Sequence, residues 1–274
     1  MADSPEKQAP LRPPLPPFAD PLPNEPLNGD RDKFLRGAIA LFSTSLKARH
    51  EIREQSKVDY GRLLDAHLIT MSLIMRAVQR SHLAPGTTSA SISERLTLFA
   101  SFIQGLDLAE TAISEGLYFQ AAALIKQQLE TVAAMTELTK GKRKDGRTPN
   151  VSHLLWRLNV HYGRIQGAAH VSNSALLHDF YQAEAQGQAT PVSILPRYSR
   201  SAARYSYTLE VAVMLHFALA VGDLFQDMYG DRWNDEELRS IVQVAELLES
   251  EGAFEDSEPT ALKTTRDDGR PAGK

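Results

Sequence analysis

The chain of 274 residues contains no cysteine, which excludes disulfides, a thiol nucleophile and cysteine-ligated zinc or iron–sulfur sites. It has no run of 18 uncharged apolar residues, so the sequence predicts no membrane-spanning segment. It lacks HExxH, Glu-x-x-His, GxSxG and strand-linked GxGxxG motifs, so we expect neither a metal nor a cofactor. The N-terminus has no basic segment followed by an apolar one, and we therefore expect a cytoplasmic protein.

The charge of the chain is unevenly distributed, although the overall composition is that of an ordinary globular protein with 42% hydrophobic residues. The 34 acidic residues outnumber the 30 basic ones, for a net charge of −4. Residues 1–30 and residues 249–274 each carry −3, which leaves a mildly basic core of +2 over residues 31–248. The acidity of the protein therefore belongs to its two ends.

Proline is concentrated at one end of the chain, because nine of the 15 prolines fall within the first 26 residues. Such a segment favours polyproline II over helix, and residues 12–17 resemble a ligand for a proline-binding groove of another protein; a simple spacer is the alternative. The final residues are rich in Ser, Thr, Gly, Pro and Asp. We expect a disordered Pro-rich extension over 1–29, a single helical domain over 30–249 and a disordered tail over 250–274.

Apolar residues recur every three or four positions through the core, which predicts an all-α bundle of six to eight helices. The pattern is helical over residues 30–83, with one helix broken near Gly61 or two separate helices. Ser91 and Glu94 have the spacing of a capping box at the next helix start, and Gly116 divides that helix from one over 117–140.

The second half of the core continues this helical pattern. We expect helices over 150–170, 173–186, 200–229 and 234–249, with an extended loop or small hairpin over 187–199. The helix over 200–229 is the most apolar of the chain, and its charged residues favour a buried core helix over a membrane span.

A basic segment is the clearest candidate for a binding surface, because residues 126–170 carry a net charge of +5. Its loop contains Lys142, Arg143, Lys144 and Arg147. On a continuous helix, His153, Arg157 and His161 would follow one another at intervals of four and line a single strip. A basic, histidine-bearing surface suits RNA or a nucleotide, whereas a solvated basic face gives the same pattern.

Arg164 and His170 form the candidate catalytic pair. Their six-residue spacing resembles that of the HEPN class of helical, metal-independent nucleases. In such a site the imidazole exchanges a proton with the ribose hydroxyl or the leaving oxygen, and the guanidinium stabilises charge on the phosphorus-centred transition state. On a straight helix the two side chains point about 120° apart. Their convergence requires a helix break, for which Gly167 is the candidate, or a dimer interface.

A second resemblance covers residues 93–225 and is to uncharacterised bacterial helical proteins related in outline to HEPN domains. Lys126 and Glu130 match a basic-x-x-x-Glu signature, while Tyr162, Ile165 and His170 match a later Tyr–Leu–Ser–His pattern in which Gln166 occupies the Ser position. The loop at 194–196 and the apolar helix after it also follow the expected order. This resemblance implies a HEPN-like core.

Lys126 and Glu130 also permit a purely structural interpretation. Four residues apart on a helix, they form an ion pair, and a partly buried Glu130 would need a further partner such as Tyr162 or His170. The leading hypothesis is a metal-independent ribonuclease or RNA-binding protein of defence or toxin type that acts as a homodimer and contacts no membrane. The alternative is a non-catalytic interaction module in which the Lys126, Glu130, Tyr162 and histidine cluster is structural.

Overall fold

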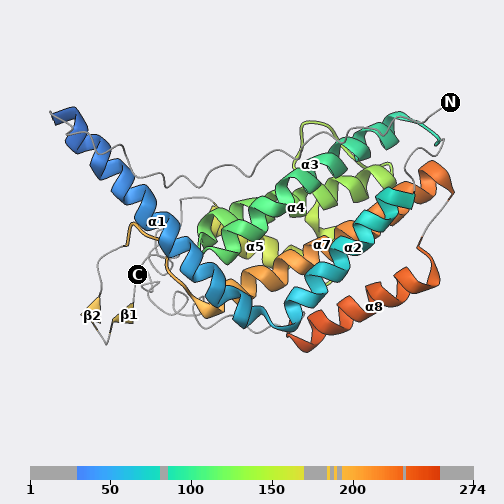
Figure 1. Ribbon diagram of the computed structural model, residues 1–274. Helices are drawn as coiled ribbons and strands as arrows, with labels where there is room; N and C mark the ends of the chain where they lie inside the picture. Colours follow the sequence, from blue (N-terminus) through green and yellow to red (C-terminus); the bar gives the residue numbers. More distant parts are fainter. Residues whose placement is uncertain are drawn as a thin grey trace, which may run out of the picture. The chain divides into compact units, whose positions relative to one another are not determined.

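The computed structural model describes residues 30–80, 86–169, 184–185, 188–189, 193–230 and 233–253. Over these ranges the protein is all-helical apart from one two-residue strand pair, with seven α-helices and one short 3-10 helix (Figure 1). The predicted all-α bundle of six to eight helices is confirmed. Most of the predicted Pro-rich extension and acidic tail lies outside the described residues.

The chain divides into two compact units, Met1–Leu46 and Lys47–Lys274, and helix α1 (Asp30–Tyr60) begins in the first and ends in the second. Gly61 ends α1 with a left-handed backbone (φ 50°), and α2 (Arg62–Arg80) follows directly. The predicted break near Gly61 is confirmed, because a positive φ is readily adopted only by glycine.

Helix α3 (Ala90–Ser114) begins two residues earlier than the sequence pattern indicated. The cap is Ser89, whose side chain accepts a hydrogen bond from the Ile92 amide, so the predicted capping box of Ser91 and Glu94 is wrong. At the other end Gly116 has φ 76°, and a Cβ placed there would lie 2.9 Å from the carbonyl oxygen of Arg197. This glycine separates α3 from α4 (Tyr118–Thr139), as predicted.

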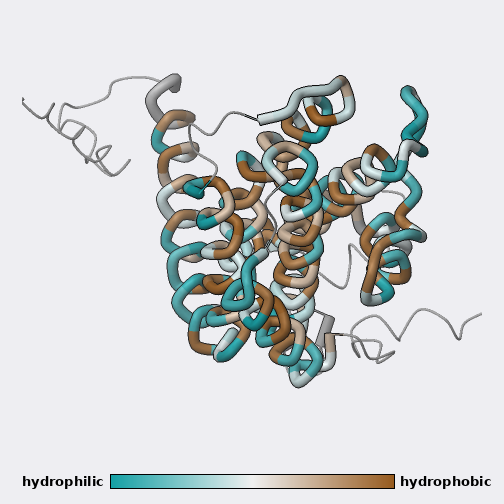
Figure 2. The backbone as a smooth tube through the Cα atoms, turned by 90° about the vertical axis from the view of Figure 1, so that its right-hand side faces the viewer, coloured by the Kyte–Doolittle hydropathy of each residue, from teal (hydrophilic) through white to brown (hydrophobic). Residues whose placement is uncertain are grey.

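Helix α7 (Arg200–Tyr229) is the centre of the second unit and packs against α2, α3, α4 and the last helix, α8 (Asp235–Ser250). Brown and teal alternate along the helices in Figure 2, so each surrounding helix can turn apolar residues toward this centre. Phe217 of α7 stacks on Phe102 of α3 with ring centroids 3.7 Å apart, and Tyr207 stacks on Tyr60 of α1 at the same separation. The most apolar helix is therefore the buried one, as predicted.

Two of the described helices, α3 and α7, are long and apolar enough by length and composition to cross a membrane. The core helix of a globular protein passes the same test, and 83% of the apolar window of α7 is buried within the protein, against 28% for α3. The high buried fraction of α7 is that expected of a core helix.

Helix α8 is fixed at its N-terminal end by polar contacts and by one close approach. Asn234 and Glu237 form a capping box, and Glu237 also accepts a hydrogen bond from Arg80 of α2 at 2.8 Å. Trp233 lies directly on Gly222 of α7, where a Cβ would stand 2.2 Å from the indole nitrogen. Only glycine at position 222 leaves room for this tryptophan.

Two predictions for the segment between α4 and α7 are wrong. The helix expected over 150–170 is instead a 3-10 helix, η1 (Val151–His153), followed by a non-helical linker and by α5 (Leu158–Ala169). Strands β1 (Glu184–Ala185) and β2 (Gln188–Ala189) form an antiparallel pair, so the helix expected over 173–186 is wrong at residues 184 and 185. Residues 173–183 and residue 186 lie outside the described ranges.

Glu210 is a fully buried carboxyl group in the middle of α7. Its Oε1 accepts a hydrogen bond from Gln128 Nε2 at 2.9 Å, whereas Glu210 Oε2 and Gln128 Oε1 have no partner. Burial raises the pKa of Glu210 to about 8. The hydrogen bond from Gln128 lowers the pKa, but it offsets only part of the effect of burial. At neutral pH the group is therefore a protonated acid.

We predict that Glu210→Gln stabilises the protein above pH 5 and has little effect at pH 4. The folded state keeps its proton up to about pH 8, whereas an unfolded glutamate releases it near 4.5, so the free energy of unfolding falls as pH rises between these values. The amide removes this dependence, and we expect a gain on the order of 3 kcal/mol at pH 7. Urea denaturation at several pH values measures the effect.

The matched control is Glu54→Gln, because Glu54 is exposed and ion-paired with Lys57. This substitution should leave the difference in the free energy of unfolding between pH 5 and pH 8 unchanged. A Glu210→Gln variant with the same pH dependence as the wild type would show that Glu210 is not held neutral.

Candidate functional site

The basic loop between α4 and η1 begins with a glycine-terminated helix end. Gly141 has φ 62°, its amide bonds to the Leu138 carbonyl oxygen at 3.1 Å, and the Lys142 amide bonds to the Glu137 carbonyl oxygen at 2.8 Å. These two bonds satisfy carbonyl groups that the end of a helix leaves free. They turn the chain sharply at the point where the run of basic residues starts.

Glu137 organises the loop although its side chain is only 11% exposed. Its Oε1 accepts a hydrogen bond from the Asn150 amide at 2.8 Å, and its Oε2 pairs with Arg143 Nη1 at 3.4 Å. Arg143 Nη1 also donates to the Arg147 carbonyl oxygen at 2.8 Å. One buried carboxylate thus joins the beginning and the end of the loop through a charged pair and a backbone amide.

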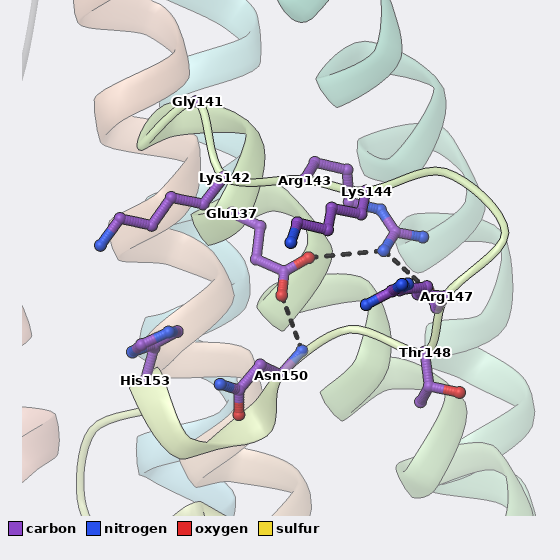
Figure 3. A pocket seen from close by; sticks show the side chains of 9 residues that line it. All are labelled: Glu137, Gly141, Lys142, Arg143, Lys144, Arg147, Thr148, Asn150 and His153. Atoms are coloured by element: carbon purple, nitrogen blue, oxygen red, sulfur yellow. Dashed lines mark hydrogen bonds and ion pairs between the residues drawn. The ribbon is translucent and has the colours of Figure 1, made fainter.

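The loop encloses an open pocket of about 650 Å³ (Figure 3). In this view Lys142 and His153 lie on one side of Glu137, and Arg147 and Thr148 lie on the other. Nine residues line it: Glu137, Gly141, Lys142, Arg143, Lys144, Arg147, Thr148, Asn150 and His153. The four cations of the predicted basic loop are therefore brought together around one cavity.

The pocket has a surplus of positive charge. Lys142, Lys144 and Arg147 are exposed, whereas the one lining carboxylate, Glu137, is engaged with Arg143 and the Asn150 amide. Asp145 is the other acid of the loop, and it accepts a hydrogen bond from the amide of Gly146. Three exposed cations around one cavity give this surface a positive potential, which favours anions.

The structure separates the residues that were expected to form one helical strip. His153 lies in η1 and lines the pocket, whereas His161 lies in α5. Between them, Trp156 and Arg157 both have left-handed backbones, with φ of 53° and 57°. A helix cannot continue through two such residues, so the predicted strip of His153, Arg157 and His161 is wrong.

A buried histidine supports this unusual linker. His216 of α7 accepts a hydrogen bond from the Leu155 amide at its Nδ1 (3.3 Å), and Trp156 meets its ring edge-on with centroids 6.0 Å apart. Burial lowers the pKa of His216 to about 4, so the ring is neutral and its Nδ1 is free to accept. Two left-handed residues cost on the order of 1–3 kcal/mol each, and this contact helps to hold them.

A second polar cluster joins α4 to α5. Glu130 Oε1 accepts hydrogen bonds from Lys126 Nζ at 2.8 Å and from the Tyr162 hydroxyl at 2.6 Å. The Lys126 ammonium also lies 5.7 Å from the centre of the Tyr162 ring. Lys126 and Glu130 are 20% and 25% exposed, so the sequence-matched pair is partly buried and Tyr162 is its third member.

Tyr162 is held in its protonated form by this arrangement. Burial, then the hydrogen bond to Glu130 and the negative charge of that group, raise the pKa of Tyr162 to about 12. The phenol is therefore a hydrogen-bond donor over the whole physiological range. Such a donor suits a structural contact, and it does not act as a base at neutral pH.

A third polar group, on the residue that precedes Tyr162 in α5, contacts α7. His161 Nδ1 lies 3.0 Å from the Tyr205 hydroxyl, and the two rings are tilted with centroids 5.7 Å apart. The pKa of Tyr205 is raised by burial, and the nearby positive charge of Arg164 acts in the opposite direction. His161 and Arg164 thus converge on one tyrosine.

The candidate catalytic pair is described only in part. Arg164 is half-buried on α5, whereas His170 lies outside the described residues. Helix α5 runs through Gly167 to Ala169 without interruption, so the break expected at Gly167 is absent from this described helix. Among the residues that the structure describes, no group of three or more histidine, aspartate or glutamate side chains is arranged to hold a metal ion.

Sequence reasoning did not identify Glu137 or Asn150 as part of the site. The available signal was the position of Glu137 four residues before a helix-ending glycine and six before Arg143. A carboxylate placed there can reach back into the loop that follows its own helix. Arg157 was expected at the basic surface, but it does not line the pocket.

Comparisons of the chain with protein-family models, with curated proteins and with solved structures gave no match. The assignment of function therefore depends on the pocket and the polar clusters themselves.

We predict that Glu137→Ala loosens the basic loop. The substitution removes the acceptor of both Arg143 and the Asn150 amide, which should lower the free energy of unfolding by about 1–3 kcal/mol. Limited trypsin digestion checks the local effect, because the loop offers cleavage after Lys142, Arg143, Lys144 and Arg147. Cleavage within 142–147 should become faster than in the wild type.

The control is Glu94→Ala, which removes an exposed glutamate from α3. It should leave both the stability and the rate of loop cleavage near their wild-type values. Equal cleavage rates in the Glu137 variant and the wild type would show that this carboxylate does not order the loop.

Proposed function

We propose that this protein binds RNA through the basic pocket, which contacts the phosphate backbone of a single strand. The observation that carries the proposal is the convergence of Lys142, Lys144 and Arg147 on one open cavity, whose lining carboxylate is already paired within the loop. Lysine and arginine neutralise phosphates and release their counterions, which supplies most of the affinity of such contacts. A guanidinium such as that of Arg147 also bonds phosphate oxygens in pairs.

The other lining residues favour a backbone contact over base recognition. Apart from the His153 imidazole, the nine lining residues provide no aromatic ring on which a base could stack. Thr148 and Asn150 supply a hydroxyl and an amide that can hydrogen-bond a ribose hydroxyl. We therefore expect weak sequence preference and a strong dependence of affinity on salt.

Cleavage of the bound strand is the catalytic form of this proposal. The resemblance to HEPN nucleases assigns that step to Arg164 and His170, with a HEPN-like core and without a metal ion. Arg164 lies on α5, which follows η1 and its pocket residue His153 along the chain. The short linker between them is the segment held by His216.

A non-catalytic interaction module is the second candidate. The observation that favours it is the mutual satisfaction of Lys126, Glu130 and Tyr162, in which every charge has a partner within the cluster. A satisfied cluster between α4 and α5 fixes how the two helices pack and needs no substrate. In this case the protein would act through an exposed surface only.

We predict that replacing Lys142, Lys144 and Arg147 together by alanine weakens RNA binding at least tenfold at low salt. Fluorescence anisotropy with a labelled single strand of about 12 nucleotides measures the affinity. The slope of the logarithm of affinity against that of salt should fall by about 2, because about 0.7 is lost for each phosphate contact to a single strand. Free nucleotide is included as a competitor to separate a nucleotide site from an RNA site.

The matched control removes three exposed cations elsewhere, Lys57, Arg62 and Arg239, and therefore changes the net charge by the same amount. This variant should bind RNA with the wild-type affinity and salt slope. Equal losses in the two triple variants would indicate general electrostatic attraction, and no binding by the wild type would overturn the proposal.

A cleavage assay with the same RNA tests the catalytic form. We expect products in the presence of EDTA from the wild type and none from Arg164→Ala or His170→Ala, with binding retained in both variants. Binding without cleavage in the wild type would leave an RNA-binding protein, and cleavage that requires a metal ion would contradict the assigned mechanism.

A further inference from the structure

The face of α5 that packs against α7 carries two basic residues that meet one tyrosine. His161 and Arg164 are three residues apart, so they lie on the same face of the helix. His161 Nδ1 lies 3.0 Å from the hydroxyl of Tyr205, and Arg164 forms a hydrogen bond to the same hydroxyl. All three side chains are partly exposed, so these residues, which we call the Tyr205 cluster, lie where a ligand can reach them.

The hydrogen-bond donors and acceptors of the Tyr205 cluster match one another. A guanidinium has no acceptor, so Arg164 donates to the Tyr205 oxygen. The hydroxyl has a single hydrogen of its own, and His161 Nδ1 is within reach as its acceptor. The two bonds hold the Arg164 side chain in one position, which reduces the conformational entropy that it would lose on binding a ligand.

Tyr205 orients Arg164 without cancelling its positive charge. Burial raises the pKa of Tyr205, and the charge and the hydrogen bond of Arg164 offset only part of that increase. The phenol therefore stays neutral at physiological pH, in contrast to Glu130, which forms an ion pair with Lys126. A guanidinium has five N–H donors, which are enough to bond Tyr205 and two oxygens of one phosphate group together.

The Tyr205 cluster lies within reach of a strand that is held in the basic pocket. Tyr205 and His216 are 11 residues apart on α7, which corresponds to about 16 Å along the helix. His216 bonds the Leu155 amide, two residues after His153 of the pocket. A stacked strand advances about 3.4 Å per nucleotide, so about five nucleotides cover this distance.

We propose that Tyr205 is a positioning residue, which holds Arg164 in place to bind a second phosphate group of the RNA strand, about five nucleotides from the phosphates in the basic pocket. The inference rests on the proposed function, because it takes RNA as the ligand. It adds Arg164 to the binding surface and gives Tyr205 a role that acts through Arg164. His161 supports the tyrosine as the second partner of its hydroxyl.

A double-mutant cycle of Tyr205→Phe and Arg164→Gln tests the coupling between the two residues. Fluorescence anisotropy with a single strand of about 12 nucleotides measures the affinity at low salt. We expect a loss of about fivefold for Arg164→Gln, the equivalent of one hydrogen bond, and of about threefold for Tyr205→Phe, which keeps the charge. The double variant should bind no more weakly than Arg164→Gln, because Tyr205 acts only through the guanidinium. In all three variants the basic pocket still holds the strand, so binding is weakened but retained.

The length of the strand separates this contact from damage to the fold. A trinucleotide is too short to join the pocket to Arg164, so Tyr205→Phe and Arg164→Gln should both leave its affinity unchanged. The triple alanine variant of the basic pocket should instead weaken the binding of both strands. The control Tyr229→Phe removes a hydroxyl from the other end of α7 and should bind both strands like the wild type. Circular dichroism checks that each variant keeps its helix content.

Three results would overturn the inference and leave RNA binding by the basic pocket intact. Wild-type affinity of Tyr205→Phe for the long strand, additive losses in the double variant, or an equal loss for the two strands would each show that Tyr205 does not act by positioning Arg164. A wild type that binds no RNA would contradict the proposed function, and this inference with it.

Discussion

The fold of the second unit depends on the burial of one helix. Helix α7 is 30 residues long, and its middle section has no side that faces solvent. Removing that apolar surface from water requires helices on every side, and α2, α3, α4 and α8 provide them. The need to bury the apolar surface of α7 explains why α2 and α8, from opposite ends of this unit, pack against the same helix.

Several polar groups of this interior are either neutral or paired. Glu210 is neutral and shares its bond with Gln128, and His216 is neutral and accepts from the linker before α5. The side chain of Glu137 is paired with Arg143 and with a backbone amide. Glu137 also affects the surface, because its bonds to Arg143 and to the Asn150 amide hold the loop that lines the basic pocket.

Much of the helical framework could be predicted from the sequence, because it depends on patterns within single helices. The breaks at Gly61 and Gly116, the buried character of α7 and the basic loop all follow from local composition and spacing. The break after η1 could not be predicted in this way. Leu154 and Leu158 have helical spacing, and the left-handed residue Trp156 contacts His216, which lies 60 positions further along the chain.

The candidate site shows the same division between local and distant information. Four cations within six positions predicted the basic loop, and their contact with one cavity follows from the turn at Gly141. The bond between Tyr162 and Glu130 was anticipated from the need of a partly buried acid for a partner. The roles of Glu137 and Asn150 arise from the path of the loop, which no helical period encodes.

The contact between Trp233 and Gly222 has a consequence for how related sequences should be interpreted. Glycine inside a long helix lowers helix stability by about 1 kcal/mol, yet any side chain at 222 would collide with the indole that sits there. The packing of the fold alone therefore disfavours any substitution of Gly222. Invariance at this position would then record the fit of one tryptophan and would be no evidence of a binding site in α7.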